Sequence, residues 1–235
     1  MGDYLREKTS SPKEAAPYYQ EVLGRPDVSY RFDARFGLAD VYGRSSNEKD
    51  QRKAVGELLE IYANSEENSQ KEQGLYRVVE ILTSMEAWDE VKTQASEYLN
   101  PAVNRDKNDA NNLNFRQYDD RVAYLKAFAH DQLGESEDAY IAYLQVASAY
   151  EGNAIVSAPS VKRMLEILWA RNQKGSGKTP ADRQFAYDYG AGFNSRTRNF
   201  LSNPNVPEDT KEVLRELIEM VARYKAHPDV KAAAE

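Results

Sequence analysis

The chain has no cysteine and only two histidines, His130 and His227, among its 235 residues. Without cysteine it can form no disulfide, no thiolate nucleophile and no zinc site with cysteine ligands. Two imidazoles alone also exclude most combinations of a nucleophile with a base and most sets of metal ligands. We therefore predict that the chain is not an enzyme and that it holds no metal or cofactor.

Long apolar runs are also missing. No stretch approaches the roughly 18 residues that a membrane-spanning helix needs, and the first residues, MGDYLREKTSSPKE, lack the apolar centre of a signal peptide. Lys and Arg number 31 against 38 Asp and Glu, a net charge of −7, while 41% of the residues are hydrophobic. This composition suits a chain with a buried core, no nucleic-acid partner and no direct insertion into a membrane.

A pattern of three side chains recurs along the first part of the chain. The second and third members follow the first by four and seven residues, which places all three on one face of a helix. The copies are Ala15, Tyr19 and Val22; Ala54, Leu58 and Ile61; Val91, Ala95 and Tyr98; and Ala139, Tyr143 and Val146. They predict helices within residues 14–27, 53–64, 86–100 and 133–150.

A second amphipathic stretch precedes three of these helices, at residues 34–44, 74–85 and 121–133. Each unit is thus predicted to be a pair of helices joined by a short turn. Leu133-Gly134 is the clearest turn signal, because glycine readily adopts the left-handed conformation that ends many helices.

Beyond residue 150 the repeat fades while helical patterns continue. Residues 160–172 and 212–224 predict amphipathic helices, and Thr179-Pro180 predicts the start of another helix, loosened by Gly190 and Gly192. Strand signals are scarce, so we predict an all-α fold. The helix at 212–224 is expected to close the end of the stack.

The helix pairs resemble tetratricopeptide repeats (TPR), which are helical hairpins of about 34 residues. The residues that match are the small crossing residues Ala15 and Ala139, the aromatic residues Tyr19 and Tyr143, and the helix-ending prolines Pro26 and Pro101. The resemblance covers roughly residues 12–150. The copies stand further apart than in the family, Val91 replaces one small residue, and the Trp and Leu-Gly of the first helix are mostly missing. Residues 26–44 also resemble TPR proteins of the bacterial cell envelope.

The resemblance implies a right-handed α-solenoid of TPR-like helical hairpins with a C-terminal capping helix. The predicted organisation is an N-terminal tail (1–11), TPR-like helical repeats (12–172), a flexible loop (173–180), a C-terminal helical cap (181–226) and a C-terminal tail (227–235).

Two loop sequences partly match ligand-binding motifs. Residues 172–179, NQKGSGKT, end like a phosphate-binding loop, but Asn172 stands where the first glycine belongs and a helix precedes the motif instead of a strand. Residues 104–112 resemble half of a calcium loop, without the central glycine and the bidentate glutamate. We interpret both as solvated loops. His130 is expected to pack or to lie at the surface, since no other His or Cys stands near it.

In TPR arrays the first helix of each pair lines a concave groove, and the resemblance places candidate partner-binding residues there. The face opposite the packing stripe carries Phe36, Asp40, Tyr76, Arg77, Glu80, Arg121, Tyr124 and Phe128. Aromatic and arginine side chains are favoured at binding hot spots. The alternative is that Phe36, Tyr76 and Phe128 pack between neighbouring repeats. The Lys, Asn and Arg with which the family clamps a C-terminal carboxylate are not matched, so no such clamp is expected.

The resulting hypothesis is a non-catalytic protein–protein interaction scaffold that binds a partner peptide or protein in its groove, with acidic residues favouring neutral or basic peptides. One alternative is the accessory TPR region of a longer enzyme or envelope protein. Another is a structural module that self-associates through residues 212–224 if their apolar face is not covered internally. Oligomeric state stays open, as does location, between the bacterial periplasm or cell envelope with its targeting signal removed and the cytoplasm.

Overall fold

The computed structural model describes residues 12–25, 30–100, 117–171 and 180–231. These residues form helices and include no strand, which confirms the predicted all-α class. Backbone contacts divide the chain into two compact units, Met1–Ala129 and His130–Glu235. None of the described helices is both long enough and apolar enough to cross a membrane. The predicted N-terminal tail, residues 1–11, and residues 172–179 lie outside the described part, as do Pro26 and Pro101.

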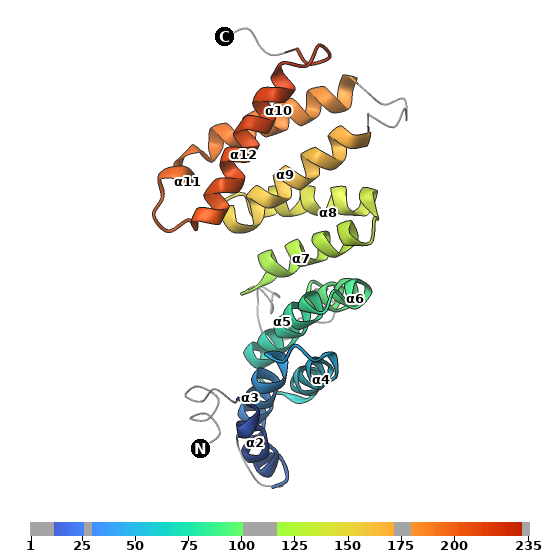
Figure 1. Cartoon of the computed structure of the whole chain (residues 1–235), viewed down its shortest axis with the longest axis vertical. Helices are drawn as coiled ribbons and strands as arrows, with labels where there is room; N and C mark the ends of the chain where they lie inside the picture. The colour runs from blue at the N-terminus through green and yellow to red at the C-terminus, as the bar shows by residue number, and fades with distance from the viewer. Residues whose placement is uncertain (1–11, 26–29, 101–116, 172–179, 232–235) are drawn as a thin grey trace. The chain divides into compact units, whose positions relative to one another are not determined.

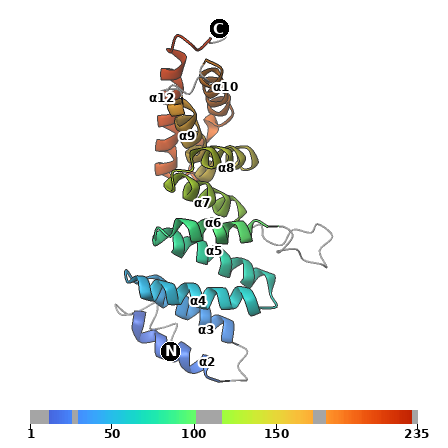
Figure 2. The same ribbon diagram turned by 90° about the vertical axis from the view of Figure 1, so that its right-hand side faces the viewer.

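In the first unit each helix packs against the next one along the chain, from η1 to α6 (Figure 1). The elements are η1 (Pro12–Ala15), α2 (Ala16–Leu23), α3 (Arg31–Gly43), α4 (Glu48–Asn64), α5 (Asn68–Ser84), α6 (Trp88–Tyr98) and α7 (Asp119–Gln132). The last residues of α7 belong to the second unit. Figure 2 shows the same succession of α2 to α6 from the side. The predicted helices are therefore present.

The recurring three-residue pattern marks buried helix faces. The four copies fall on η1 with α2, on α4, on α6 and on α8 (Ser136–Ala149). Every member is buried except Val22, which is partly buried. The first helix of each pair also contributes to the core. Its buried residues include Leu38 on α3 and Leu75, Val78, Val79 and Leu82 on α5. The periodicity of the sequence thus predicted correctly which side chains enter the core.

Two turns between paired helices have the same backbone geometry. After α5, Glu86 has φ 57°, the Ala87 N–H donates to the Leu82 carbonyl at 3.0 Å, and the Glu86 N–H donates to Thr83. After α7, Gly134 has φ 73° and the Glu135 N–H donates to the His130 carbonyl at 3.0 Å. This pattern satisfies the last carbonyls of a helix through one left-handed residue. It confirms the predicted turn at Gly134.

A buried carboxylate fixes the start of α7 in the first unit. Glu72 on α5 accepts hydrogen bonds from the Tyr98 hydroxyl at 2.5 Å and from the Gln117 N–H at 2.7 Å. The Tyr98 oxygen in turn accepts from the Tyr118 N–H at 3.1 Å. Burial and the neighbouring carboxylate raise the pKa of Tyr98 well above its usual value. These hydrogen bonds hold Gln117 and Tyr118, directly before α7, against α5 and α6.

In the second unit, helices α9, α10 and α12 pack against one another and α8 packs against α9. The remaining bounds are α9 (Ala154–Arg171), α10 (Pro180–Arg196), α11 (Arg198–Ser202) and α12 (Glu208–Lys225). Helices α8 and α9, predicted as part of the repeats, thus share a unit with the predicted cap. Most of the apolar face of α12 is buried, including Leu214, Leu217, Val221 and Tyr224, while Ile218 is 42% exposed. Self-association through 212–224 stays a prediction, since Ile218 leaves part of this apolar face uncovered.

Gly190 has a packing role in α10. A Cβ atom at this position would lie 2.6 Å from Cγ2 of Val221 and 3.0 Å from Cδ1 of Leu165. The helix continues through Gly190 to Arg196. The missing side chain of Gly190 thus lets α10 approach its neighbours closely, a role that the sequence did not predict.

Residues 227–231 of the predicted C-terminal tail are attached to α10. Arg183 forms an ion pair with Asp229. Gln184 accepts a hydrogen bond from the Lys231 N–H at 2.7 Å and donates one to its carbonyl at 3.1 Å. These contacts extend the second unit beyond the end of α12.

Candidate functional site

The eight predicted groove residues lie on helices α3, α5 and α7 within the first unit. We call them the first-helix strip: Phe36, Asp40, Tyr76, Arg77, Glu80, Arg121, Tyr124 and Phe128. Tyr76 is buried, Glu80 and Arg121 are exposed, and the other members are partly buried. The structure connects them in three groups.

The first group joins α3 to α5. The Arg77 guanidinium forms an ion pair with the Asp40 carboxylate and lies over the Phe36 ring, 5.9 Å from its centroid. Both charged side chains are about one-fifth exposed. A pair that is partly shielded from water is screened less by salt than an exposed one. Asp40 and Arg77 thus neutralise each other's charge and link α3 to α5.

The second group joins α5 to α7. The Tyr76 hydroxyl donates to the Glu80 carboxylate at 2.5 Å and accepts from the Arg121 guanidinium at 3.4 Å. The Tyr76 ring stacks on the ring of Tyr118, with centroids 4.1 Å apart. Burial, followed by the Glu80 carboxylate, raises the pKa of the Tyr76 hydroxyl. This buried ring packs between helices, as in the alternative interpretation of the sequence.

The third group is aromatic. Tyr124 and Phe128 stack along α7 with ring centroids 6.4 Å apart, and Phe128 meets the ring of Trp88 on α6 edge-on at 5.4 Å. Phe128 thus contacts a second helix as well as its neighbour on α7. The partly exposed members of this group, together with exposed Arg121, offer surface to another molecule.

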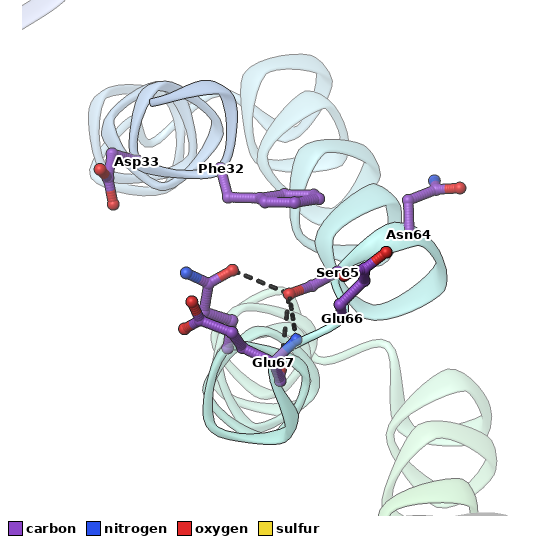
Figure 3. Close-up of a pocket in the computed structure, with 7 residues that line it drawn as sticks. Phe32, Asp33, Asn64, Ser65, Glu66 and Glu67 are labelled. Carbon is purple, nitrogen blue, oxygen red and sulfur yellow. Dashed lines mark hydrogen bonds between the residues drawn. The ribbon is translucent and has the colours of Figure 1, made fainter. Parts of the chain in front are cut away.

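A pocket lies at the N-terminal end of the strip (Figure 3). Its volume is about 360 Å³. The lining residues come from the first turn of α3, the end of α4 and the start of α5: Phe32, Asp33, Asn64, Ser65, Glu66, Glu67 and Gln70. In Figure 3 the Phe32 ring extends from α3 towards the turn between α4 and α5.

Hydrogen bonds hold the floor of this pocket in place. The buried Ser65 hydroxyl donates to Oε1 of Gln70 at 2.8 Å and accepts from the Glu67 N–H at 3.1 Å. The turn between α4 and α5 is therefore tied to the first turn of α5. The carboxyl groups at the rim have no cationic partner in the part of the chain that the structure describes: Asp33, Glu66 and Glu67.

The pocket was not predicted from the sequence, although the helical spacing of two of its residues indicates where they lie. Phe32 precedes Phe36 by four residues, so these two side chains share one face of α3. Gln70 precedes Arg77 by seven residues, so these two share one face of α5. Extending those faces by one or two turns would have included them. The residues of the turn, Ser65 to Glu67, carry no such periodic signal.

Comparisons of the chain with protein-family models, curated proteins and solved structures give no match. The function has to be inferred from the strip, the pocket and the surrounding side chains.

A second pocket, of about 510 Å³, lies between α9 and α12 in the second unit. Trp169 stacks on Tyr224 there with ring centroids 3.8 Å apart, and the Arg183 guanidinium lies 5.6 Å from the Trp169 ring. Burial raises the pKa of the Tyr224 hydroxyl. Trp169 is thus held on two sides by groups of its own chain.

One group of side chains in the second unit has metal-ligand chemistry. A ring nitrogen of His130, a carboxylate oxygen of Glu135 and one of Asp138 lie within 4.8 Å of one another. Nδ1 of His130 also makes a 2.6 Å hydrogen bond with Glu135, which links the end of α7 to the start of α8. The half-matched motifs at 104–112 and 172–179 lie outside the described residues.

Proposed function

We propose that this chain is a non-catalytic protein–protein interaction scaffold that binds a peptide or protein along the first-helix strip. The observation that carries the proposal is the pair of links across the strip, Asp40 with Arg77 and Tyr76 with Arg121. They join α3, α5 and α7 side chain to side chain. Because these helices are linked before any partner arrives, binding along them would require little ordering of the surface.

The architecture that we propose is a TPR-like right-handed solenoid. The buried three-residue pattern and the equivalent turns at Glu86 and Gly134 support it, since both recur from one helix pair to another. In such an arrangement the strip would line a groove that accepts an extended or helical segment. Tyr124 and Phe128 would supply apolar contact area, and Arg121 a charged hydrogen-bond donor.

A peptide-display selection against the intact chain tests this proposal without a known partner. The strip variant is Glu80→Ala, Arg121→Ala and Tyr124→Ala, at exposed or partly exposed positions. The control variant removes the same three residue types away from the strip, Glu90→Ala, Arg52→Ala and Tyr18→Ala, all of them exposed.

We expect the selected peptides to bind the strip variant at least about tenfold more weakly than the original chain, which corresponds to about 1.4 kcal/mol. They should bind the control variant with unchanged affinity. Equal binding to all three proteins, or a selection that yields no specific peptide, would contradict the proposal. Circular dichroism confirms that each variant retains its helices.

A further inference from the structure

We propose that the pocket formed by Phe32 and the α4–α5 turn receives an arginine side chain of the partner. This inference rests on the proposed function, since it names a feature of the segment that binds along the strip. It starts from the pocket's position at the end of the strip. Phe32 lies one helical turn before Phe36 on α3, so a segment lying along the strip reaches the pocket.

The charge of the pocket is its most specific property. Several acidic side chains elsewhere on α3 and α4 have cationic partners: Asp40 pairs with Arg77, Glu57 with Arg35, and Asp50 with Lys13 and Lys53. The three carboxylates at the pocket rim have none among the described residues. Unneutralised negative charge is therefore concentrated where the surface is hollow, and it is complementary to a cation.

Helix capping does not account for these carboxylates. Asp33 lies in the first turn of α3, where an acidic residue interacts favourably with the helix dipole. Glu67 occupies the N-cap position of α5, but its side chain makes no capping hydrogen bond. Glu66 belongs to neither helix. Glu66 therefore has no local role in the fold, while Asp33 and Glu67 each lie at a helix N-terminus and interact favourably with its dipole.

The C-terminal end of α4 adds to the negative potential. Asn64 is the last residue of this helix, Ser65 is its C-cap, and both line the pocket. The final carbonyl groups of a helix carry partial negative charge and favour a cation nearby. The N-terminal ends of α3 and α5, which line the same pocket, carry partial positive charge and offset this effect, so the attraction for a cation comes from the three carboxylates.

Arginine fits the pocket better than lysine. Its planar guanidinium can stack on the partly exposed ring of Phe32 while its N–H groups donate to carboxylates in the same plane. Its aliphatic stem can cover the remaining apolar surface. A lysine ammonium is more strongly hydrated and presents a point charge, so it gains less from the ring.

Nuclear magnetic resonance with a small probe tests this pocket apart from the strip. The probe is N-acetyl-arginine N-methylamide, and the matched probe is the citrulline analogue, which has nearly the same shape and no charge. The pocket variant is Asp33→Asn, Glu66→Gln and Glu67→Gln. The control variant, Asp89→Asn, Glu212→Gln and Glu219→Gln, changes the net charge equally at exposed sites elsewhere.

We expect saturable shifts of the Ser65, Glu66 and Gln70 amide signals with the arginine probe. Its affinity should fall at least about fivefold for the pocket variant, for the citrulline probe and at high salt, and stay unchanged for the control variant. The single substitution Glu66→Gln, at an exposed turn residue, should lower the affinity for the arginine probe by less than the triple pocket variant does.

Four outcomes would overturn the inference. Equal shifts of the amide signals with the arginine and citrulline probes would show that charge does not contribute to binding. An equal loss in pocket and control variants would indicate non-specific attraction to an acidic surface. Sedimentation showing a dimer that only the pocket variant abolishes would assign the pocket to a second copy of the chain. A peptide that depends on the strip but not on the pocket would leave the proposed function intact while this inference fails.

Discussion

The rings of Tyr76 and Tyr118 lie parallel, with an interplanar angle of 3° and 4.1 Å between their centroids. This stacking places the start of α7 against α5. We expect Tyr76→Ala to destabilise the chain by about 3 kcal/mol, as other losses of a buried aromatic ring do. Tyr76→Phe keeps the ring and loses only the hydroxyl contacts, which should cost about 1 kcal/mol or less. Urea unfolding measures both; equal costs would contradict a role for the ring.

Gly190 offers a test of close helix packing. Gly190→Ala should lower stability by about 1–3 kcal/mol, because the added methyl group meets Val221 and Leu165. Gly56→Ala is the matched control. No atom lies within 4 Å of a Cβ at that exposed helical position, so this substitution should raise stability by about 0.5–1 kcal/mol. Thermal unfolding gives the sign of each change, and a stabilising Gly190→Ala would contradict the packing described.

The equivalent turns at Glu86 and Gly134 predict opposite effects. Glu86 adopts a left-handed conformation that is unfavourable for residues with a side chain, so Glu86→Gly should stabilise the chain by up to about 1 kcal/mol. Gly134→Ala should destabilise it by about 1 kcal/mol through backbone strain alone, since no atom lies within 4 Å of the new Cβ. Chemical denaturation checks both. The same sign for the two substitutions would argue against their equivalence.

The Tyr98 hydroxyl serves two partners, Glu72 and the Tyr118 N–H. Tyr98→Phe leaves a buried carboxylate with one hydrogen bond fewer, so we expect a loss of about 1–3 kcal/mol. Tyr62→Phe is the control. It removes a hydroxyl that donates to Glu97 at 2.7 Å in a partly exposed place, and it should cost less. Equal urea midpoints for the two variants would show that the Glu72 network contributes little.

Asp50 gives the chain a predictable pH dependence. Hydrogen bonds from Lys13 and then Lys53 lower the pKa of Asp50 from 3.8 to about 2. Because the folded pKa is the lower one, the carboxylate stabilises the fold fully above about pH 4, and this contribution is lost as the pH falls towards 2. Asp50→Asn should therefore have a lower Tm than the original chain at pH 6.

The two Tm values should converge near pH 2, where the original carboxylate is also protonated. Salt should reduce the difference at pH 6, since Lys13 is well exposed. A Tm difference that stays constant from pH 6 to pH 2 would show that the charge of Asp50 does not contribute.

Much of the fold could be predicted from the sequence, because burial of a helix face depends on local spacing. Ala54, Leu58 and Ile61 repeat at helical intervals, and all three are fully buried. The turn at Gly134 carried an equally local signal, since few residue types adopt its conformation. Apolar positions at helical intervals also predicted the helices that carry the candidate binding residues.

The partners of those residues were decided by the tertiary structure. Whether Arg77 meets Asp40, or Glu72 meets Tyr98, depends on the distance and rotation between helices, which no interval along the chain specifies. The same holds for the Phe32 pocket, whose lining comes from the ends of three helices. The sequence determined which faces are apolar through the period of the α-helix. Packing then decided which charges are neutralised within the chain and which are left for a partner, because that depends on contacts between distant segments.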